Sequence, residues 1–430
     1  MSYRPSNLVC CLLLLVLACT VAAAGARADD GRQDDARLKP LIAALDHDSA
    51  DERVRAAEGL GHLGPRAKAA VGAIIGRLQD EDALVRATAA WALGRIGPDA
   101  APAVPELIVA LEDSTVHEDG WSVGEMACEA LGRIGPPAAT ELMAALDSPH
   151  AHVRRGAAIA LYGAGPAAKA AVPKLIAMVR AGDPATLEPA IHALGGIGPD
   201  AAAAVPDLIG LLDSERLQTR WLACRALAGI GPEAGAAVPR LLELLEDETT
   251  STRVNAALAL GRVGGKSADA VVPPLVKALS DRRAAVREEA VAALGVLGPA
   301  AGAAAADVER VLADASFPAR IPAAKALWQI TGKAETSVSF LAGQLGRIET
   351  GLDAAVTLGD FGPEAATAVP ALIASFSSPE PEIRAAAAET LGRIGRAAEP
   401  ALPALEKLAD DPVEEVREAA RAAQHRIAPR

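Results

Sequence analysis

Apolar positions recur with helical spacing in two alternating segments along the chain. In the first clear copy of the longer segment, five apolar residues share one face of a helix: Val85, Ala89, Ala92, Leu93 and Ile96. Gly97 and Pro98 follow, and they are typical of a helix end because glycine accepts a left-handed backbone and proline prevents continuation. The pattern predicts an amphipathic helix, here called helix B, that ends at Ile96.

A second, shorter phrase lies between successive copies of helix B. It reads VPELIVAL at residues 104–111 and returns as VPKLIAMV from 172, VPDLIGLL from 205, VPRLLELL from 238, VPPLVKAL from 272 and VPALIASF from 369. Proline is tolerated in the first turn of a helix, where its missing N–H had no partner. Each phrase therefore predicts the start of a short helix, helix A.

The two segments repeat along almost the whole chain. ALGRIGP at residues 92–98 returns from residue 130, and its leucine, the key leucine below, recurs mostly every 33 or 34 residues at Leu60, Leu93, Leu131, Leu161, Leu194, Leu227, Leu260, Leu294, Leu327, Leu358 and Leu391. A twelfth copy has Gln424 in this place, on a polar helix suited to a terminal cap. Two short helices cannot bury their apolar faces alone, so residues 29–430 are predicted to form an all-α solenoid of twelve stacked repeats.

These repeats resemble HEAT repeats, specifically the short variety also found in phycobilin lyases. The resemblance implies an α-superhelix whose B helices line the concave side. It also implies a scaffold more readily than an enzyme, because such arrays mostly act as scaffolds and only a few are enzymes.

Residues 1–28 differ from the repeats. Arg4 precedes an apolar stretch from Leu8 to Ala24, and small residues at 26 and 28 precede Asp29, which predicts a cleaved signal peptide and a periplasmic or secreted protein. A retained membrane anchor would need close to 20 apolar residues, more than are present. The segment ending at Cys19 also resembles a lipobox, so a lipid-anchored protein is an alternative.

Composition narrows the class of partner. The chain has a formal net charge of −13. Loss of Arg4 and Arg27 with the signal peptide would leave 40 bases against 55 acids, a net charge of −15. Such a surface repels phosphate backbones, so no nucleic-acid partner is expected, and protein or peptide remains.

An arginine stands seven residues before the key leucine in most repeats: Arg86, Arg154, Arg220, Arg253, Arg287, Arg320, Arg384 and Arg417. One interpretation is a basic ladder for an anionic ligand. The other is structural pairing with acids of the turns before helix B, such as Asp82, Asp113, Asp147, Asp213, Asp281 and Asp314. Regular recurrence favours the structural interpretation.

Positions that vary between repeats are freer to serve a partner. Those two and five residues before the key leucine lie opposite the core stripe of helix B, and the third repeat adds a long connection, EDSTVHEDGWS, at residues 112–122. The predicted partner-binding site therefore consists of Trp91, Trp121, Met126, Glu129 and Ile159. The alternatives are a neutral inner surface and a tolerated insertion.

Catalytic chemistry has little support. A metal site was considered for His117, Glu118 and Asp119 with His150 and His152. The repeats also resemble deoxyhypusine hydroxylase, whose di-iron site uses several His-Glu pairs, but only one such pair, at residues 117 and 118, is present. We therefore expect no cofactor, and a metal-binding or lyase- or hydroxylase-like enzyme using the third repeat's loop is the alternative to a noncatalytic scaffold.

Four other residues give local expectations. After removal of the signal peptide, Cys128 and Cys224 are the remaining cysteines, and their repeats are too far apart for a disulfide. Pro189 and Pro322 lie within the helix B pattern and should delay or kink their helices.

Overall fold

The computed structural model describes residues 30–116, 121–314 and 319–429, which form helices joined by short turns. The predicted signal peptide with Cys19 lies outside the described residues, as do His117, Glu118 and Asp119. The prediction of an all-α solenoid is confirmed, with helices A and B alternating along the chain in twelve described pairs. The chain divides after Ile134 into an N-terminal unit and a C-terminal unit that begins at Gly135.

The N-terminal unit holds three A/B pairs. They are α2 (Asp30–Ala44) with α3 (Ala50–Leu63), α4 (Val71–Arg77) with α5 (Ala83–Ile96), and α6 (Val104–Ala110) with α7 (Val123–Ile134). Helix α5 ends at the predicted residue, and Gly97 beyond it has a φ of 77°. The proline of the VP phrase stands second in α6, in the first turn, as expected.

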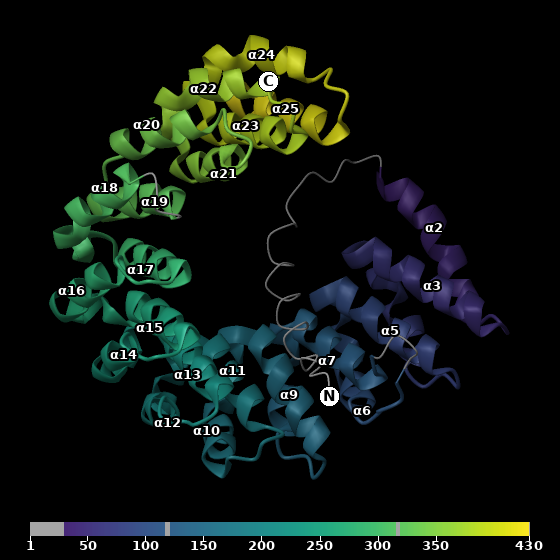
Figure 1. Cartoon of the computed structure of the whole chain (residues 1–430). Helices are drawn as coiled ribbons and strands as arrows, with labels where there is room; N and C mark the ends of the chain where they lie inside the picture. Colours follow the sequence, from purple (N-terminus) through teal and green to yellow (C-terminus); the bar gives the residue numbers. More distant parts are fainter. Residues whose placement is uncertain (1–29, 117–120, 315–318, 430) are drawn as a thin grey trace, which may run out of the picture. The chain divides into compact units, whose positions relative to one another are not determined.

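The C-terminal unit holds nine pairs. Its A helices are α8 (Ala139–Ala145), α10 (Val172–Ala181), α12 (Val205–Leu211), α14 (Val238–Leu244), α16 (Ala268–Ala278), α18 (Ala305–Ala313), α20 (Glu335–Gln344), α22 (Val369–Ala374) and α24 (Leu402–Leu408). Its B helices are α9 (Ala151–Ala164), α11 (Leu187–Ile197), α13 (Leu217–Ile230), α15 (Thr250–Val263), α17 (Ala284–Leu297), α19 (Arg320–Thr331), α21 (Gly351–Phe361), α23 (Pro381–Ile394) and α25 (Glu414–Ile427). Within this unit the B helices follow the inner side of the curve and the A helices the outer side (Figure 1).

Short 3-10 helices fill most connections from helix B to the next helix A, a feature that the helical pattern did not predict. They are η1 (Gly64–Ala70), η2 (Gly97–Ala103), η3 (Pro136–Ala138), η4 (Gly165–Ala171), η5 (Gly198–Ala204), η6 (Gly231–Ala237), η7 (Gly264–Ser267), η8 (Gly298–Ala304), η9 (Gly362–Ala368) and η11 (Gly395–Ala401), while η10 (Ser375–Ser377) ends helix α22. In η2, Gly97, Ala100 and Ala103 are all buried. A spacing of three matches the turn of a 3-10 helix, so these small residues form its inward edge.

Neighbouring B helices approach closely because a glycine often follows the key leucine. A Cβ added at Gly94 of α5 would lie 2.8 Å from the Cα of Ala130 on α7, and one at Gly261 of α15 would lie 2.7 Å from the Cα of Ala293 on α17. Such contacts leave no room for a larger side chain. They explain why alanine and glycine, rather than aromatic residues, make up much of the core.

The two prolines in helix B act at the helix start. Pro189 and Pro322 are each the third residue of their helices, α11 and α19, which have 11 and 12 residues where α13, α15 and α17 have 14. The first turn has no N–H partners to lose, so proline is accepted there. The predicted delay of these helices is confirmed.

One stretch among the described residues, Ala284–Ala313, is apolar and long enough to cross a membrane by length and composition alone. It joins α17, η8 and α18, and 44% of its apolar window is buried inside the protein. Core helices of soluble proteins pass the same test, so this stretch is weak evidence for a span.

Candidate functional site

The candidate surface of the N-terminal unit centres on Trp91, which lies on α5 and is half-buried. The ring rests against Gly61 of α3, where an added Cβ would lie only 2.2 Å from the ring atom Cζ3. His62 meets the ring edge-on, with centroids 5.3 Å apart, and the Arg95 guanidinium lies 5.9 Å from the ring centroid. The indole of Trp91 therefore packs against Gly61, with the Arg95 guanidinium over its ring. The sequence analysis did not identify His62 and Arg95 as neighbours of Trp91.

Trp121 ends a connection that is held at both sides. Val116 and Ser122 form an antiparallel bridge, and Ser122 and Glu125 make reciprocal hydrogen bonds at the start of α7: the Ser122 N–H donates to Glu125 Oε2 at 2.8 Å, and the Glu125 N–H donates to Ser122 Oγ at 3.2 Å. This arrangement is a capping box. Trp121 itself is half-buried. The bridge and the capping box therefore hold Val116 and Ser122 in place.

The glycine in the arginine slot of the third repeat has a packing reason. A Cβ at Gly124 would lie 3.0 Å from the carbonyl oxygen of Leu111 and 3.1 Å from that of Asp113. The Gly124 N–H donates to the Asp113 carbonyl at 2.9 Å. The backbone carbonyl groups of the preceding turn thus leave little room for a side chain at this position.

The remaining predicted site residues divide between the units. Met126 and Glu129 lie half-buried on α7, and Glu129 accepts from Arg133 Nε at 2.9 Å. Ile159 is half-buried on α9 of the C-terminal unit. Trp91, Met126 and Glu129 therefore share one unit on neighbouring B helices, whereas Ile159 belongs to the other unit.

An aromatic pair joins two neighbouring B helices of the C-terminal unit. Tyr162 of α9 and His192 of α11 stack with ring centroids 4.0 Å apart, and Gly196 makes room for Tyr162, because a Cβ there would lie 2.5 Å from a ring atom. Burial lowers the pKa of His192 to about 4, and the positive charge of Arg225 contributes. His192 therefore stays neutral where an exposed histidine would be charged.

This burial predicts a pH dependence of stability. Because the folded pKa is lowered from 6.5 to about 4, the unfolded chain takes up the proton first as pH falls. The stability from neutral His192 is thus fully present above pH 6.5 and lost on acidification towards pH 4, an effect on the order of 3 kcal/mol. His192→Phe keeps a ring against Tyr162 and should flatten the dependence by this amount. Denaturant unfolding between pH 4 and 7 measures it, and parallel curves for the two proteins would contradict it.

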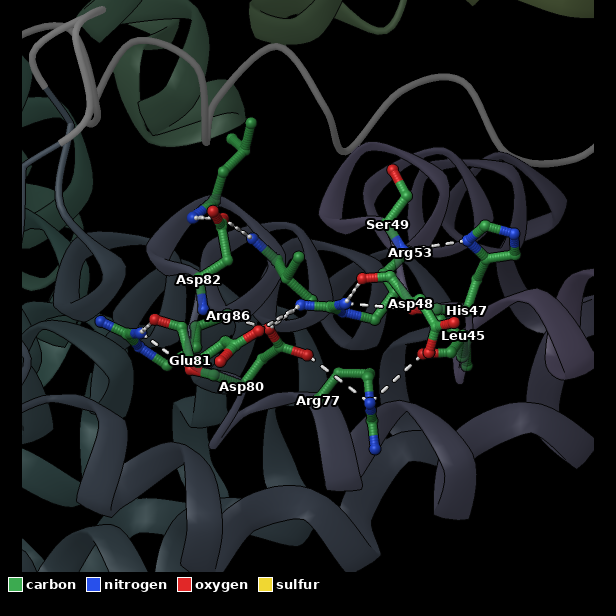
Figure 2. Close-up of polar contacts among 12 residues, drawn as sticks. Leu45, His47, Asp48, Ser49, Arg53, Arg77, Asp80, Glu81, Asp82 and Arg86 are labelled. Atoms are coloured by element: carbon green, nitrogen blue, oxygen red, sulfur yellow. Dashed lines mark hydrogen bonds and ion pairs between the residues drawn. The ribbon is translucent and has the colours of Figure 1, made fainter.

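The recurrent arginines form a structural ladder between repeats (Figure 2). In the N-terminal unit, Arg53 Nη2 donates to Asp80 Oδ1 at 2.7 Å, as Figure 2 shows. Arg86 Nε donates to Asp113 Oδ2 at 2.7 Å. Arg53 Nη1 also donates to the carbonyls of His47 and Asp48, both at 3.0 Å. Arg53 and Arg86 thus each tie the turn of their own repeat to the next turn. Arg253 and Arg384 do the same in the C-terminal unit, which supports the structural interpretation over an anion ladder.

The pairing corrects one detail of the sequence prediction. The partner carboxylate comes from the turn of the following repeat, 27 residues along for Arg53 and Arg86. Asp82 does not take part: it caps its own helix, accepting from the Leu84 and Val85 N–H groups. Asp147 and Asp213 instead accept from side chains of the next A helices, Lys174 and Arg240. Arg53, Asp80 and Asp411 also belong to the ladder but were missed, although Arg53 stands in the same register.

The ladder carboxylates are held in the charged form. Burial alone would raise the pKa of Asp80, but hydrogen bonds from Arg53 and from the Asp82 N–H outweigh it, and the pKa lies below its usual value. The pKa of Asp281 is lowered in the same way, because hydrogen bonds from Arg253 and from the Arg283 N–H outweigh the effect of burial. The arginine–aspartate pairs therefore stay ionised under mildly acidic conditions.

No cluster of three or more histidine, cysteine, aspartate or glutamate residues with metal-site geometry occurs in the described part of the chain. His150 and His152, at the start of α9, have ring centroids 5.5 Å apart. Neither Cys128 nor Cys224 forms a disulfide. Burial raises the pKa of Cys224 to about 12, so its sulfur is not a reactive thiolate.

Comparison with known proteins now places the fold. HEAT repeats match at residues 38–118, 140–218, 205–295, 238–328 and 347–424, together well over half of the chain. The chain belongs to the HEAT-repeat family. Among curated proteins, no sequence matches it.

Two solved structures resemble this HEAT-repeat protein. A chain of the Kap95:Nup1 complex aligns over 92% of it with a TM-score of 0.59 and 11% identity, and importin beta aligns over 91% with a TM-score of 0.54 and 14% identity. The protein spans 62% and 63% of those chains. At such identities the likeness establishes the solenoid fold and nothing further.

Proposed function

We propose that this HEAT-repeat protein is a noncatalytic scaffold that binds protein or peptide partners along the exposed side of its B helices. The observation that carries the proposal is Trp91, seated on Gly61 with Arg95 over its ring. A partly exposed indole that packs against Gly61 loses little entropy on binding, which suits it to anchor a partner. One similar structure is a complex with a second protein, which supports a partner-binding use of this fold.

Capture experiments test the proposal. Trp91→Ala and Trp121→Ala should each weaken capture of a natural partner, with a loss of about 2 kcal/mol, or roughly thirtyfold, for a central anchor. Val109→Ala is the matched control, because Val109 is 66% exposed on helix A of the same unit. Capture that is unchanged by both tryptophan variants would reject this site. Trp91→Phe should retain part of the binding, which separates loss of the anchor from loss of fold.

We also propose that the scaffold acts outside the cytoplasm, on the basis of residues 1–28. Mass spectrometry of the mature N-terminus should show an unmodified chain that begins at Asp29. An acylated Cys19 would show a lipoprotein instead, and an intact N-terminus would reject export by this signal. The enzymatic alternative depends on the loop at residues 112–122, and no observation among the described residues favours it.

A further inference from the structure

Helix α21 and the turn before it carry an exposed apolar stripe. Ile348, Leu352 and Val356 are 59%, 39% and 50% exposed, respectively. A spacing of four residues places Leu352 and Val356 on one face of the helix, and Ile348 lies in the turn directly before it. Three exposed aliphatic side chains in a row distinguish this helix from a surface with scattered apolar residues.

The equivalent places on other B helices are more polar or more buried. Leu352 and Val356 stand six and two residues before the key leucine, where α11 has Glu188 and His192 and α23 has Ala385 and Glu389. On α15 both residues are aliphatic, Val254 and Leu258, but both are half-buried. Among the described B helices of the C-terminal unit, both places carry exposed aliphatic residues on α21. The stripe is therefore not a requirement of the repeat.

The surroundings of the stripe are acidic. Glu349 and Asp353 beside it, and Glu382 and Glu389 on the adjacent α23, are exposed and take part in none of the ion pairs among the described residues. Residues 345–394 contain seven acids and three bases. Of the bases, Arg384 is bound to Asp411 at 2.8 Å and Arg393 lies 3.6 Å from Asp360. The third base, Arg347, is exposed beside Ile348, so four exposed acids near the stripe face one exposed base. The stripe thus lies in a negative field.

We propose that this stripe binds an amphipathic helix of a partner protein, with apolar residues on one face and lysine or arginine at its edges. The inference rests on the proposed scaffold function and adds the chemistry of the partner. An apolar face with anchors one turn apart fits a helix laid along α21, and basic edges would neutralise the unpaired acids. A second copy of this chain is disfavoured, because it would bring the same acids against each other.

The binding test uses three synthetic 18-residue peptides on the full chain. The first places leucine and lysine with a 3.6-residue period, the second has the same composition in scrambled order, and the third replaces lysine by glutamate. Fluorescence anisotropy should show binding of the first peptide at least tenfold tighter than the other two, and the affinity should fall with added salt. Equal binding of the scrambled peptide, or tighter binding of the glutamate peptide, would overturn the inference.

Variants locate the site. Val356→Asp should weaken the first peptide about tenfold by removing apolar contact, and Glu389→Lys should weaken it at low salt by reversing a charge. Val296→Asp is the matched control, because Val296 is 56% exposed on α17 and should leave affinity unchanged. An equal loss in the control, or no loss in the two test variants, would remove the stripe as the site. Sedimentation of the wild type tests for a second copy of the chain. A dimer that the Val356→Asp substitution dissociates would identify the second copy as the occupant and reject the basic helix.

The outcome for the scaffold function is separate. A natural partner that the Val356→Asp variant captures as well as the wild type does would preserve the scaffold and reject this docking site. If the leucine–lysine peptide fails to bind while a natural partner is captured, the proposal of a basic amphipathic helix is rejected and the scaffold function is kept. Absence of both natural capture and peptide binding would reject both proposals.

Discussion

Arg253→Ala is expected to lower the free energy of unfolding of the C-terminal unit by about 3–5 kcal/mol, because it leaves a partly buried carboxylate without its partner. Arg253 is 4% exposed, and its Nε and Nη2 donate to Asp281 at 2.9 and 3.1 Å. Its Nη1 donates to the carbonyls of Asp247 and Glu248 at 2.9 and 3.2 Å. One side chain thus joins two successive turns, and no smaller residue can replace these four bonds.

Denaturant unfolding followed by circular dichroism measures this loss. The matched control is Arg180→Ala, which removes a bidentate pair with Asp207 in which Arg180 is 67% exposed. Exposed pairs contribute about 1 kcal/mol or less, so the control should change little. Arg253→Ala with Asp281→Asn should recover part of the loss, because the carboxylate charge is removed as well. Equal effects of the two single arginine variants would show that burial does not decide the ladder's contribution.

Gly229→Ala is expected to destabilise the C-terminal unit by about 2–3 kcal/mol, although alanine normally stabilises a helix interior by about 1 kcal/mol over glycine. A Cβ at Gly229 on α13 would lie 2.3 Å from the carbonyl oxygen of Gly195 on α11 and 2.9 Å from its carbonyl carbon. Both are backbone atoms, which cannot turn away as a side chain can. The two helices would have to separate and open the alanine-rich contact between them.

Gly210→Ala provides the matched control for this substitution. Gly210 lies within α12, is exposed, and has no atom within 4 Å of an added Cβ. Its replacement should therefore stabilise by about 0.5–1 kcal/mol through helix propensity alone. Thermal unfolding of the two variants should shift in opposite directions. A rise in the melting temperature for both would show that α11 and α13 are not held at the distance that the structure gives.

The candidate surface was partly visible in the sequence. Trp91 and Trp121 stand out because tryptophan is rare in this chain; Trp91 occupies a variable position of helix B, and Trp121 lies in the long connection of the third repeat. The neighbours that shape the site do not stand out: the seat of Trp91 is Gly61, which occupies an ordinary repeat place on another helix. The exposed stripe on α21 was missed for a related reason. Val356 stands at the variable position two residues before the key leucine, but a sequence does not show that Leu352 and Ile348 are left uncovered beside it.

The sequence by itself determined the local structure and the order of the repeats. The 3.6-residue spacing of apolar positions, the proline of the VP phrase and the glycine after helix B act within a few residues, so helix ends such as Ile96 could be predicted directly. Recurrence at about 33 residues then established the solenoid, because each unit needs a neighbour to cover its apolar face. The tertiary structure alone decided which acid pairs with each ladder arginine and which B-helix residues stay exposed. Those features depend on contacts between repeats about 27 to 36 residues apart, where small differences in helix start and side-chain size select one partner among several of the same type.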